Sequence, residues 1–300
     1  MKTNLIVRSL TGIIFVIVLV GGILWSPTSF GLLFTIITGM TVWEFCTIIN
    51  KNEGTQVNRL ITTVAGVYLF FAVLGFNRNI VGAEIFIPYL VSIIYLLISE
   101  LYFDRAKSIY NWAFSLMAQL YIALPFSLLN VLSYVVSRDP YTLEYNVVYT
   151  PTLVLSVFIY LWASDTGAYC FGSMLGKHKL FPRISPNKTW EGSIGGGITA
   201  IIASQIIAYF CKDFYYGNDT VNAIAWGGLA IIVVIFGTWG DLAESLLKRK
   251  LGIKDSGNIL PGHGGMLDRF DSSLIAIPAA VIYIYTLNIF GILEDLAKLF

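Results

Sequence analysis

The chain has 300 residues, of which 56% are hydrophobic and only 12% are charged. A soluble domain would carry about twice that share of charged residues, so the composition excludes an ordinary soluble protein. The net charge of +1 points to no strongly acidic or basic partner, and nothing in the sequence indicates nucleic-acid binding. The three cysteines lie in or beside apolar runs, which argues against a disulfide framework, and with two histidines they do not suggest a zinc site.

Apolar runs near the length that spans a bilayer recur along the chain. The first run could pass for a signal peptide, but it is long and no Ala-x-Ala cleavage site follows it, so we expect a retained membrane helix. The pattern predicts an all-α, polytopic integral membrane protein with about nine transmembrane helices. We place these helices at residues 9–25, 29–49, 60–76, 84–103, 110–136, 152–173, 193–211, 223–239 and 271–293.

Lysine and arginine residues are divided unevenly between the two sides that these helices define. With the N-terminus inside, fifteen of them fall in inner segments and four in outer segments. This bias predicts a cytoplasmic N-terminus and a multi-pass protein of the cytoplasmic membrane. We expect residues 1–300 to form a single membrane domain, in which residues 1–150 carry little that indicates a function and residues 151–300 hold the candidate site on the cytoplasmic side.

Carboxylates inside the predicted helices differ in depth. Glu44 and Glu100 fall near inner helix ends, where a carboxylate can reach water, so a structural role is favoured for both. Asp165 lies about two turns from the inner end of the sixth predicted helix, where a charge is costly. We therefore treat Asp165 as a candidate functional residue, with a structural hydrogen bond to a neighbouring helix as the alternative.

The inner loop at residues 176–192 ends in residues that typically start a helix. Ser185 and Thr189 are candidate caps of the seventh predicted helix, and Lys188 and Thr189 would present donors to a phosphate at that helix N-terminus. A well-capped helix with a basic flank is the structural reading, and the two are compatible. The four glycines that follow predict a smooth face for close helix packing; these are Gly192, Gly195, Gly196 and Gly197.

The stretch from the eighth predicted helix to residue 271 carries most of the unusual chemistry. Asp241, Ser245 and Lys248 share one face if the helix continues past residue 239, and an i, i+4 pair of Glu244 with Lys248 is the structural alternative. Dense cations suit a phosphate-rich ligand, carboxylates three apart can hold Mg²⁺, and adjacent glycines let backbone N–H groups approach an anion. These groups are Lys248, Arg249, Lys250, Lys254 and Arg269; Asp268 and Asp271; and Gly264 and Gly265.

In the predicted topology all these polar residues converge on the inner leaflet. An anionic ligand bound with a metal at the inner membrane surface accounts for this convergence better than several independent structural accidents do.

Residues 245–271 resemble the signature of the phosphatidate cytidylyltransferase family, also called CDP-diacylglycerol synthases. The positions that match are Ser245, Leu247, Lys248, Arg249, Lys254, Asp255, Gly257, Leu260, Pro261, His263, Gly264, Gly265, Asp268, Arg269 and Asp271. Segments 164–169, 176–179 and 185–192 are also similar to the family, whereas the first 150 residues are only vaguely so. Asn187 and Ser173 depart from the family pattern, because many members have lysine or another basic residue there.

The resemblance implies a reaction, substrates and roles for particular residues. CTP and phosphatidate would give CDP-diacylglycerol and pyrophosphate with Mg²⁺, a second cation being left open. The implied catalytic residues are Asp165, Lys188, Asp241, Lys248, Arg249, Asp268 and Arg269. The implied substrate-binding residues are Ser185, Thr189, Ser245, Lys254, His263, Gly264 and Gly265. The implied metal ligands are Asp241 and Asp268 first, then Asp271 and Asp165.

Two other classes of function stay open at this point. A CTP-dependent polyprenol or lipid kinase would use a similar site to transfer a different phosphate. An ion-coupled transporter would instead need polar residues along a path through the membrane, whereas here they gather on one side. The expected partners are CTP, phosphatidate and membrane lipids, and a homodimer is left open.

Overall fold

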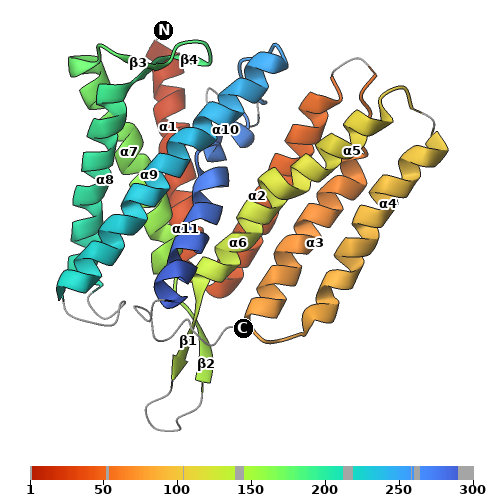
Figure 1. The fold of residues 1–300 in the computed structure, drawn as a ribbon, viewed down its shortest axis with the longest axis horizontal. Coiled ribbons are helices and arrows are strands. Elements are labelled where there is room, and N and C mark those ends of the chain that lie inside the picture. The colour runs from red at the N-terminus through yellow and green to blue at the C-terminus, as the bar shows by residue number, and fades with distance from the viewer. Residues whose placement is uncertain are drawn as a thin grey trace. The chain divides into compact units, whose positions relative to one another are not determined.

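The computed structural model describes residues 2–51, 54–103, 105–138, 145–211, 219–257, 259 and 264–289 (Figure 1). Of residues 2–9, 136–138 and 145 it describes the backbone alone. His263, which the resemblance assigned to substrate binding, lies outside the described residues.

The described chain is mainly helical. The helices are α1 (Lys2–Trp25), α2 (Pro27–Ile49), α3 (Arg59–Asn77), α4 (Ile87–Phe103), α5 (Ser108–Met117), α6 (Leu124–Ser133), α7 (Thr152–Leu175), α8 (Trp190–Phe210), α9 (Asp219–Lys250), α10 (Leu267–Phe270) and α11 (Ser273–Ile289). A 3₁₀ turn η1 (Ala83–Phe86) precedes α4, and a π-helical segment η2 (Ala118–Ala123) joins α5 to α6. The strands are β1 (Tyr134–Arg138), β2 (Tyr145–Tyr149), β3 (Lys179–Phe181) and β4 (Ser185–Thr189).

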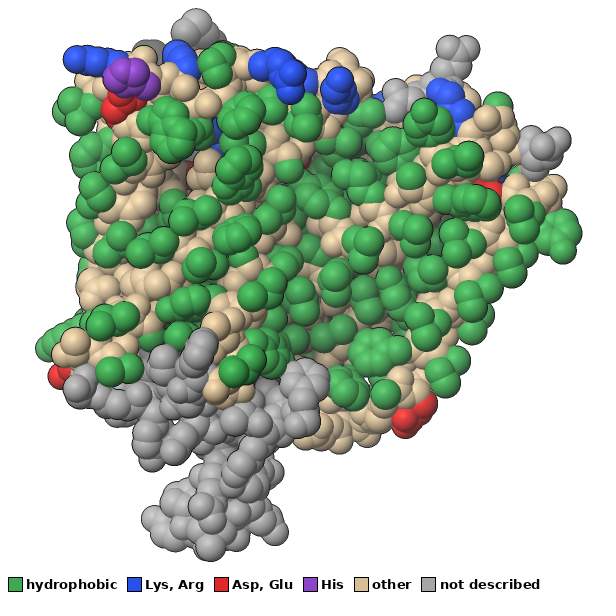
Figure 2. Space-filling view, in the orientation of Figure 1, with side chains coloured by type: hydrophobic (Ala, Val, Ile, Leu, Met, Phe, Trp, Pro, Cys, Tyr) green, Lys and Arg blue, Asp and Glu red, His purple; other side chains and the backbone are tan. Residues whose placement is uncertain are grey.

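This architecture confirms the predicted all-α polytopic membrane protein. Eight helical segments of the described chain are long and apolar enough to cross a membrane, and the apolar stretch Leu10–Trp25 of α1 matches the first predicted helix. The outer face of α8 is apolar, as expected of a helix that contacts lipid: Ile198, Ile202 and Ile206, four residues apart, are each at least half exposed. Hydrophobic side chains cover the helix flanks, and lysine and arginine side chains lie toward helix ends (Figure 2). The cytoplasmic N-terminus stays a prediction.

Several predicted boundaries were wrong. α8 begins at Trp190 rather than 193, and α9 continues to Lys250 rather than ending at 239. The last predicted helix, 271–293, corresponds to α11 (Ser273–Ile289), and the short helix α10 that precedes it was not predicted. α9 ends where Gly252 adopts a positive φ of 67°, with Ile253 N–H donating to Lys248 O and Gly252 N–H to Arg249 O. This glycine-dependent cap satisfies the last helical carbonyls and turns the chain toward residues 253–257.

The two short hairpins were also missed. β1 pairs with β2 and β3 with β4, both antiparallel. Ser185–Thr189 had been interpreted only as helix-start residues, and Thr189 does cap α8, since its Oγ1 accepts Gly192 N–H at 3.2 Å. The residue before a proline is biased toward extended backbone, which suits Ser185 to the strand, but pairing with β3 depends on the intervening turn.

The chain forms two compact units, residues 1–131 with 247–270 and residues 132–246 with 271–300. In the first unit α3 packs against α2 and α4 (Figure 1). Its core holds a chain of aromatic rings in which Phe34 contacts Phe126 and Phe126 contacts Phe270, with centroids 6.3 Å and 5.2 Å apart. Phe270 is buried, so α10 is anchored in the hydrophobic core of its own unit. The predicted division of a single domain near residue 150 stays a prediction.

In the second unit α7 and α8 run side by side, with the β3–β4 hairpin at their connected ends (Figure 1). Glycines permit this close approach, because a Cβ at Gly196 would lie 2.6 Å from Ser164 O and one at Gly167 would lie 3.0 Å from Gly195 O. Three of the four predicted packing glycines therefore face a close neighbour. Gly197 does not, since a Cβ there would meet no atom within 4 Å.

Candidate active site

A lysine–aspartate pair in the second unit joins the residues just before the N-terminus of α8 to the C-terminal part of α9. Lys188, from β4, forms an ion pair with Asp241 Oδ2 from α9, and Ser245 Oγ donates to Asp241 Oδ1 at 3.2 Å. Ser245 can do so because α9 continues past 239, as the predicted shared face required. The two charged side chains are 26% and 27% exposed, so water or a ligand can reach them.

A cavity of about 500 Å³ opens beside this pair, within the range of small-molecule sites. Asp165 and Lys188, two of the predicted catalytic residues, both line it, and so does the helix cap Thr189. Polar residues from α7, from α9 and from the turn before α11 complete the wall; they include Ser164, Tyr169, Thr238 and Ser272. Ser173 and Asn187, where the sequence departs from the family pattern, also line this cavity.

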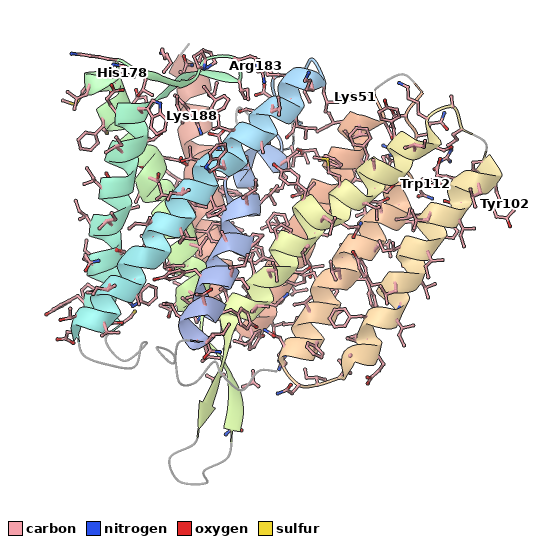
Figure 3. The ribbon with its side chains drawn as sticks, in the orientation of Figure 1. Lys51, Tyr102, Trp112, His178, Arg183 and Lys188 are labelled. Atoms are coloured by element: carbon pink, nitrogen blue, oxygen red, sulfur yellow. The ribbon has the colours of Figure 1, made fainter. Side chains whose placement is uncertain are left out.

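The β3–β4 hairpin that presents Lys188 is fastened to α8. Glu191 Oε1 pairs with His178 Nδ1 at 2.5 Å, and the same carboxylate accepts the backbone N–H groups of Lys177 and His178 at 3.2 Å. Figure 3 shows His178 and Arg183 on the hairpin and Lys188 where it joins α8. The hairpin thus fixes the direction of Lys188 before α8 begins.

Gly240 lets the segment after α10 approach α9. A Cβ at Gly240 would lie 2.7 Å from Asp271 O and 2.8 Å from Ser272 O. Asp271, a predicted metal ligand, accepts the N–H of Ser272 on its own Oδ1 at 2.5 Å. The backbone of Asp271 therefore lies against the turn of α9 that carries Asp241.

A second lysine–aspartate pair occupies the first unit. Lys248 Nζ lies 2.7 Å from Asp268 Oδ1, and the side chains are 18% and 7% exposed. Asp268 Oδ2 also lies within hydrogen-bonding distance of Ser256 N at 2.8 Å, Ser256 Oγ at 2.9 Å and Gly265 N at 2.8 Å. This carboxylate is therefore surrounded by donors from the segment that resembles the family signature.

Glu44 also belongs to this second cluster, and the sequence analysis did not predict this contact. Its carboxylate accepts the N–H of Met266 at 2.9 Å and of Leu267 at 3.1 Å, and the Oγ–H of Ser256. Glu44 and Glu100 are both only 5% exposed, so the expectation that they reach water was wrong. The sequence did contain a signal for this contact, because a carboxylate within an apolar helix needs a hydrogen-bonding partner. The position of Glu44 near the helix end instead led to the expectation that water would be that partner.

A model of the cytidylyltransferase family matches residues 6–287, almost the whole chain. The chain belongs to the cytidylyltransferase family. It is 32% identical over 267 residues to a phosphatidate cytidylyltransferase of Haemophilus influenzae, covering 85% of this chain and 89% of the relative. It is 51% identical over 125 residues to a phosphatidate cytidylyltransferase of Staphylococcus aureus, and a Staphylococcus haemolyticus protein of that name is 50% identical over 127 residues. Each staphylococcal match spans 46% of the relative, less than half of its length.

The structure also places the remaining residues to which the family resemblance assigned a role. Arg249, Lys254 and Arg269 are exposed, so their charges are accessible to an anion. Ser185 is part-buried in β4 opposite Phe181. Gly264 has a positive φ of 82°, and a Cβ there would lie 2.5 Å from Asp268 Oδ2, so a glycine is required on both counts.

The carboxylates suit a hard cation in one respect. Among the described residues no three His, Cys, Asp or Glu side chains gather closely enough to hold a metal by themselves. Mg²⁺ in phosphoryl-transfer sites is usually held by one or two carboxylates together with substrate phosphates and water, so such a site does not need a complete protein cage. Asp241, which is accessible and lies beside the cavity through Lys188, fits that use.

Proposed function

We propose that this chain transfers the cytidylyl group of CTP to phosphatidate, giving CDP-diacylglycerol and pyrophosphate. The observation that carries the proposal is the accessible Lys188–Asp241 pair beside a cavity that Asp165 also lines, in a chain of the cytidylyltransferase family. The names of the Haemophilus and Staphylococcus relatives support phosphatidate as the acceptor. The kinase and transporter readings gain no support from these relatives.

The reaction joins two anions and needs no general base. A phosphate oxygen of phosphatidate forms a bond to the α-phosphorus of CTP, and the bond from that phosphorus to the bridging oxygen of the β-phosphate breaks. Pyrophosphate leaves with the electron pair of the broken bond, and no proton has to move. The site must therefore neutralise charge and hold the oxygen, phosphorus and leaving group in line.

Lys188 is suited to exchange its partner during this reaction. Its ammonium group is paired with Asp241, yet it lines the cavity and is about one quarter exposed. A phosphate entering the cavity offers the ammonium a stronger, doubly charged partner, and Thr189 and the first turn of α8 add the favourable end of a helix dipole. Lys188 would then bind phosphate and leave an oxygen of Asp241 free.

Asp241 would hold Mg²⁺ in this proposal, with Asp268, Asp271 and Asp165 as the further ligands that the resemblance implies. When bound, Mg²⁺ would supply positive charge for the triphosphate and the departing pyrophosphate. The hydroxyl group of Ser245 orients the Asp241 carboxylate by donating a hydrogen bond to Oδ1. Removing divalent cations with EDTA is expected to stop cytidylyl transfer, and added Mg²⁺ is expected to restore it.

The experiment that tests this function follows the label of CTP. Membranes that contain the protein receive phosphatidate, Mg²⁺ and CTP labelled on either the α- or the γ-phosphorus. Cytidylyl transfer moves the α label into lipid and releases the γ label as pyrophosphate. A lipid kinase moves the γ label into lipid, which would refute the proposal, and a transporter moves neither. Membranes with the Asp241→Asn variant serve as the matched control.

We further propose that the protein lies in the cytoplasmic membrane with its N-terminus and the 176–192 loop inside the cell. The bias of basic residues supports this orientation. A single cysteine at position 187, in a variant whose three native cysteines are alanine, should resist a membrane-impermeant thiol reagent in intact cells. Labelling of this cysteine without permeabilisation would refute the proposed orientation.

A further inference from the structure

The carboxylate of Glu44 is buried in the first unit with no cation among its hydrogen-bond partners described above. It lies near the end of α2, a largely apolar helix, and is 5% exposed. Burying a carboxylate is costly unless hydrogen bonds compensate for lost water. Its position therefore calls for a specific set of donors.

Those donors come from residues more than 200 positions away in the sequence. Oε1 accepts the hydroxyl hydrogen of Ser256 and the N–H of Leu267 at 3.1 Å, and Oε2 accepts the N–H of Met266 at 2.9 Å. Ser256 precedes the part of the signature segment that the structure does not describe, and Met266 and Leu267 follow it. Glu44 thus bridges Ser256 to Met266 and Leu267.

Two glycines of the signature segment make room for this carboxylate. A Cβ at Gly257 would lie 2.7 Å from Glu44 Oε2, and one at Gly265 would overlap Glu44 Oε1 and Ser256 Oγ. Neither glycine has a positive φ, so backbone conformation is not the reason for glycine at these positions. The close approach of the Glu44 carboxylate is a physical reason.

Ser256 connects Glu44 to Asp268. Its Oγ lies beside Glu44 Oε1 and 2.9 Å from Asp268 Oδ2, and its single hydroxyl hydrogen can be donated to only one of them at a time. The backbone N–H groups of Ser256 and Gly265 also donate to Asp268. A shift of Ser256 or Gly265 relative to Glu44 would therefore move the donors that direct the Asp268 carboxylate.

We infer that Glu44 is a positioning residue: it holds Ser256 beside Met266 and Leu267, so that the Asp268 carboxylate and the Lys248 ammonium group keep their geometry. This inference rests on the proposed cytidylyl transfer. Glu44 would act through these contacts and not on the substrates themselves. It would thereby link residues 1–131 to the predicted catalytic residue Asp268.

Glu100 provides a matched control in the same unit. It is equally buried, at 5% exposed, but its carboxylate is held by Arg105 at 2.6 Å, on the α4–α5 connection, and by Asn111 at 2.8 Å, in α5. Neither of these partners belongs to the signature segment. A variant of Glu100 measures what losing a buried carboxylate does to stability alone.

The test compares Glu44→Gln with Glu100→Gln in purified protein, using steady-state kinetics and amide hydrogen exchange. The glutamine amide keeps the shape of Glu44 but turns a donor toward a donor. We expect kcat to fall about ten- to a hundredfold while KM for CTP changes less than about threefold, because misplacement costs the reaction more than binding. Exchange at Met266 and Leu267 should accelerate about tenfold, the loss of roughly one hydrogen bond. Glu100→Gln should change neither quantity.

Exchange separates this inference from the proposed function. If the wild-type protein transfers no cytidylyl group, the proposed function fails, and exchange at Met266 and Leu267 still tests the contact. If the wild type is active and Glu44→Gln keeps both kcat and exchange within about twofold of it, the inference is overturned.

Gly257→Ala provides a second route if Glu44→Gln does not fold. The added methyl group presses on the Glu44 carboxylate without removing its charge. A loss of kcat with little change in KM supports the inference, and wild-type kinetics for this variant overturn it.

Discussion

The two lysine–aspartate pairs have the same chemistry but different surroundings. Asp241 meets Lys188 and one serine hydroxyl, and about a quarter of each charged side chain is exposed beside a cavity. Asp268 meets Lys248, two backbone N–H groups and a serine hydroxyl, and is 7% exposed. The first pair can exchange partners with a ligand, whereas the second is held by the fold.

This difference decides what each pair contributes. An accessible ion pair adds little to stability, so the Lys188–Asp241 pair is free to serve binding and catalysis. A buried pair is costly to break, because removal of one partner leaves the other charge uncompensated. Changes to the Lys248–Asp268 pair are therefore expected to lower both activity and stability, whereas changes to the Lys188–Asp241 pair are expected to lower activity alone.

The largest effect is expected for Asp268→Ala. Turnover should be lost, and the free energy of unfolding should fall by about 3 kcal/mol, because Lys248 and three donors lose their acceptor. Labelled-CTP assays and thermal denaturation in detergent measure the two quantities. Asp255→Ala, an exposed carboxylate in the same segment, is the control and should leave both nearly unchanged. A stable, active Asp268→Ala protein would remove the distinction between the pairs.

Asp241→Asn should affect activity alone. We expect kcat to fall about 10²- to 10³-fold, the usual cost of removing one group that stabilises transition-state charge. The melting temperature should change by less than about 2 °C, because the side chain is accessible. Asp219→Asn, at the opposite end of α9, is the matched control and should retain wild-type turnover. A large drop in melting temperature for Asp241→Asn would contradict the comparison.

Lys188→Met should weaken use of CTP by a smaller factor. Loss of one charge-assisted hydrogen bond to phosphate is expected to lower kcat/KM about 10- to 100-fold. Stability should hardly change, since the Asp241 partner remains hydrated. Lys179→Met, an exposed lysine of β3 in the same hairpin, provides the control. Equal kinetics for the two variants would show that Lys188 acts only as part of a general basic surface.

The smallest effect concerns two glycines. Gly264→Ala should lower the free energy of unfolding by about 1–2 kcal/mol, because its φ is positive and the new methyl group meets Asp268. Gly197→Ala should be neutral or stabilise by about 0.5–1 kcal/mol, since nothing lies within 4 Å and alanine favours a helix. Thermal denaturation measures both, and equal shifts would mean that the signature glycine has no special environment.

Local patterns in the sequence were sufficient for much of this protein. Length and hydropathy predicted the membrane helices, because crossing a bilayer imposes a minimum apolar length on each segment. Spacing along a helix predicted the shared face of Asp241 and Ser245, because residues four apart lie one turn above another. The signature segment predicted the cytidylyltransferase family, which the match over residues 6–287 confirmed.

Partners far apart in the chain required the tertiary structure. A carboxylate at a helix end reaches either water or protein, and only the packing of α2 against the α10 segment decided that Glu44 meets Ser256, 212 residues later. The pairing of β3 with β4 and the contact of Lys188 with Asp241 likewise depend on how distant backbones approach. Sequence periodicity determines which face of a helix is apolar, whereas the choice among donors for a buried charge is made only when the segments pack together.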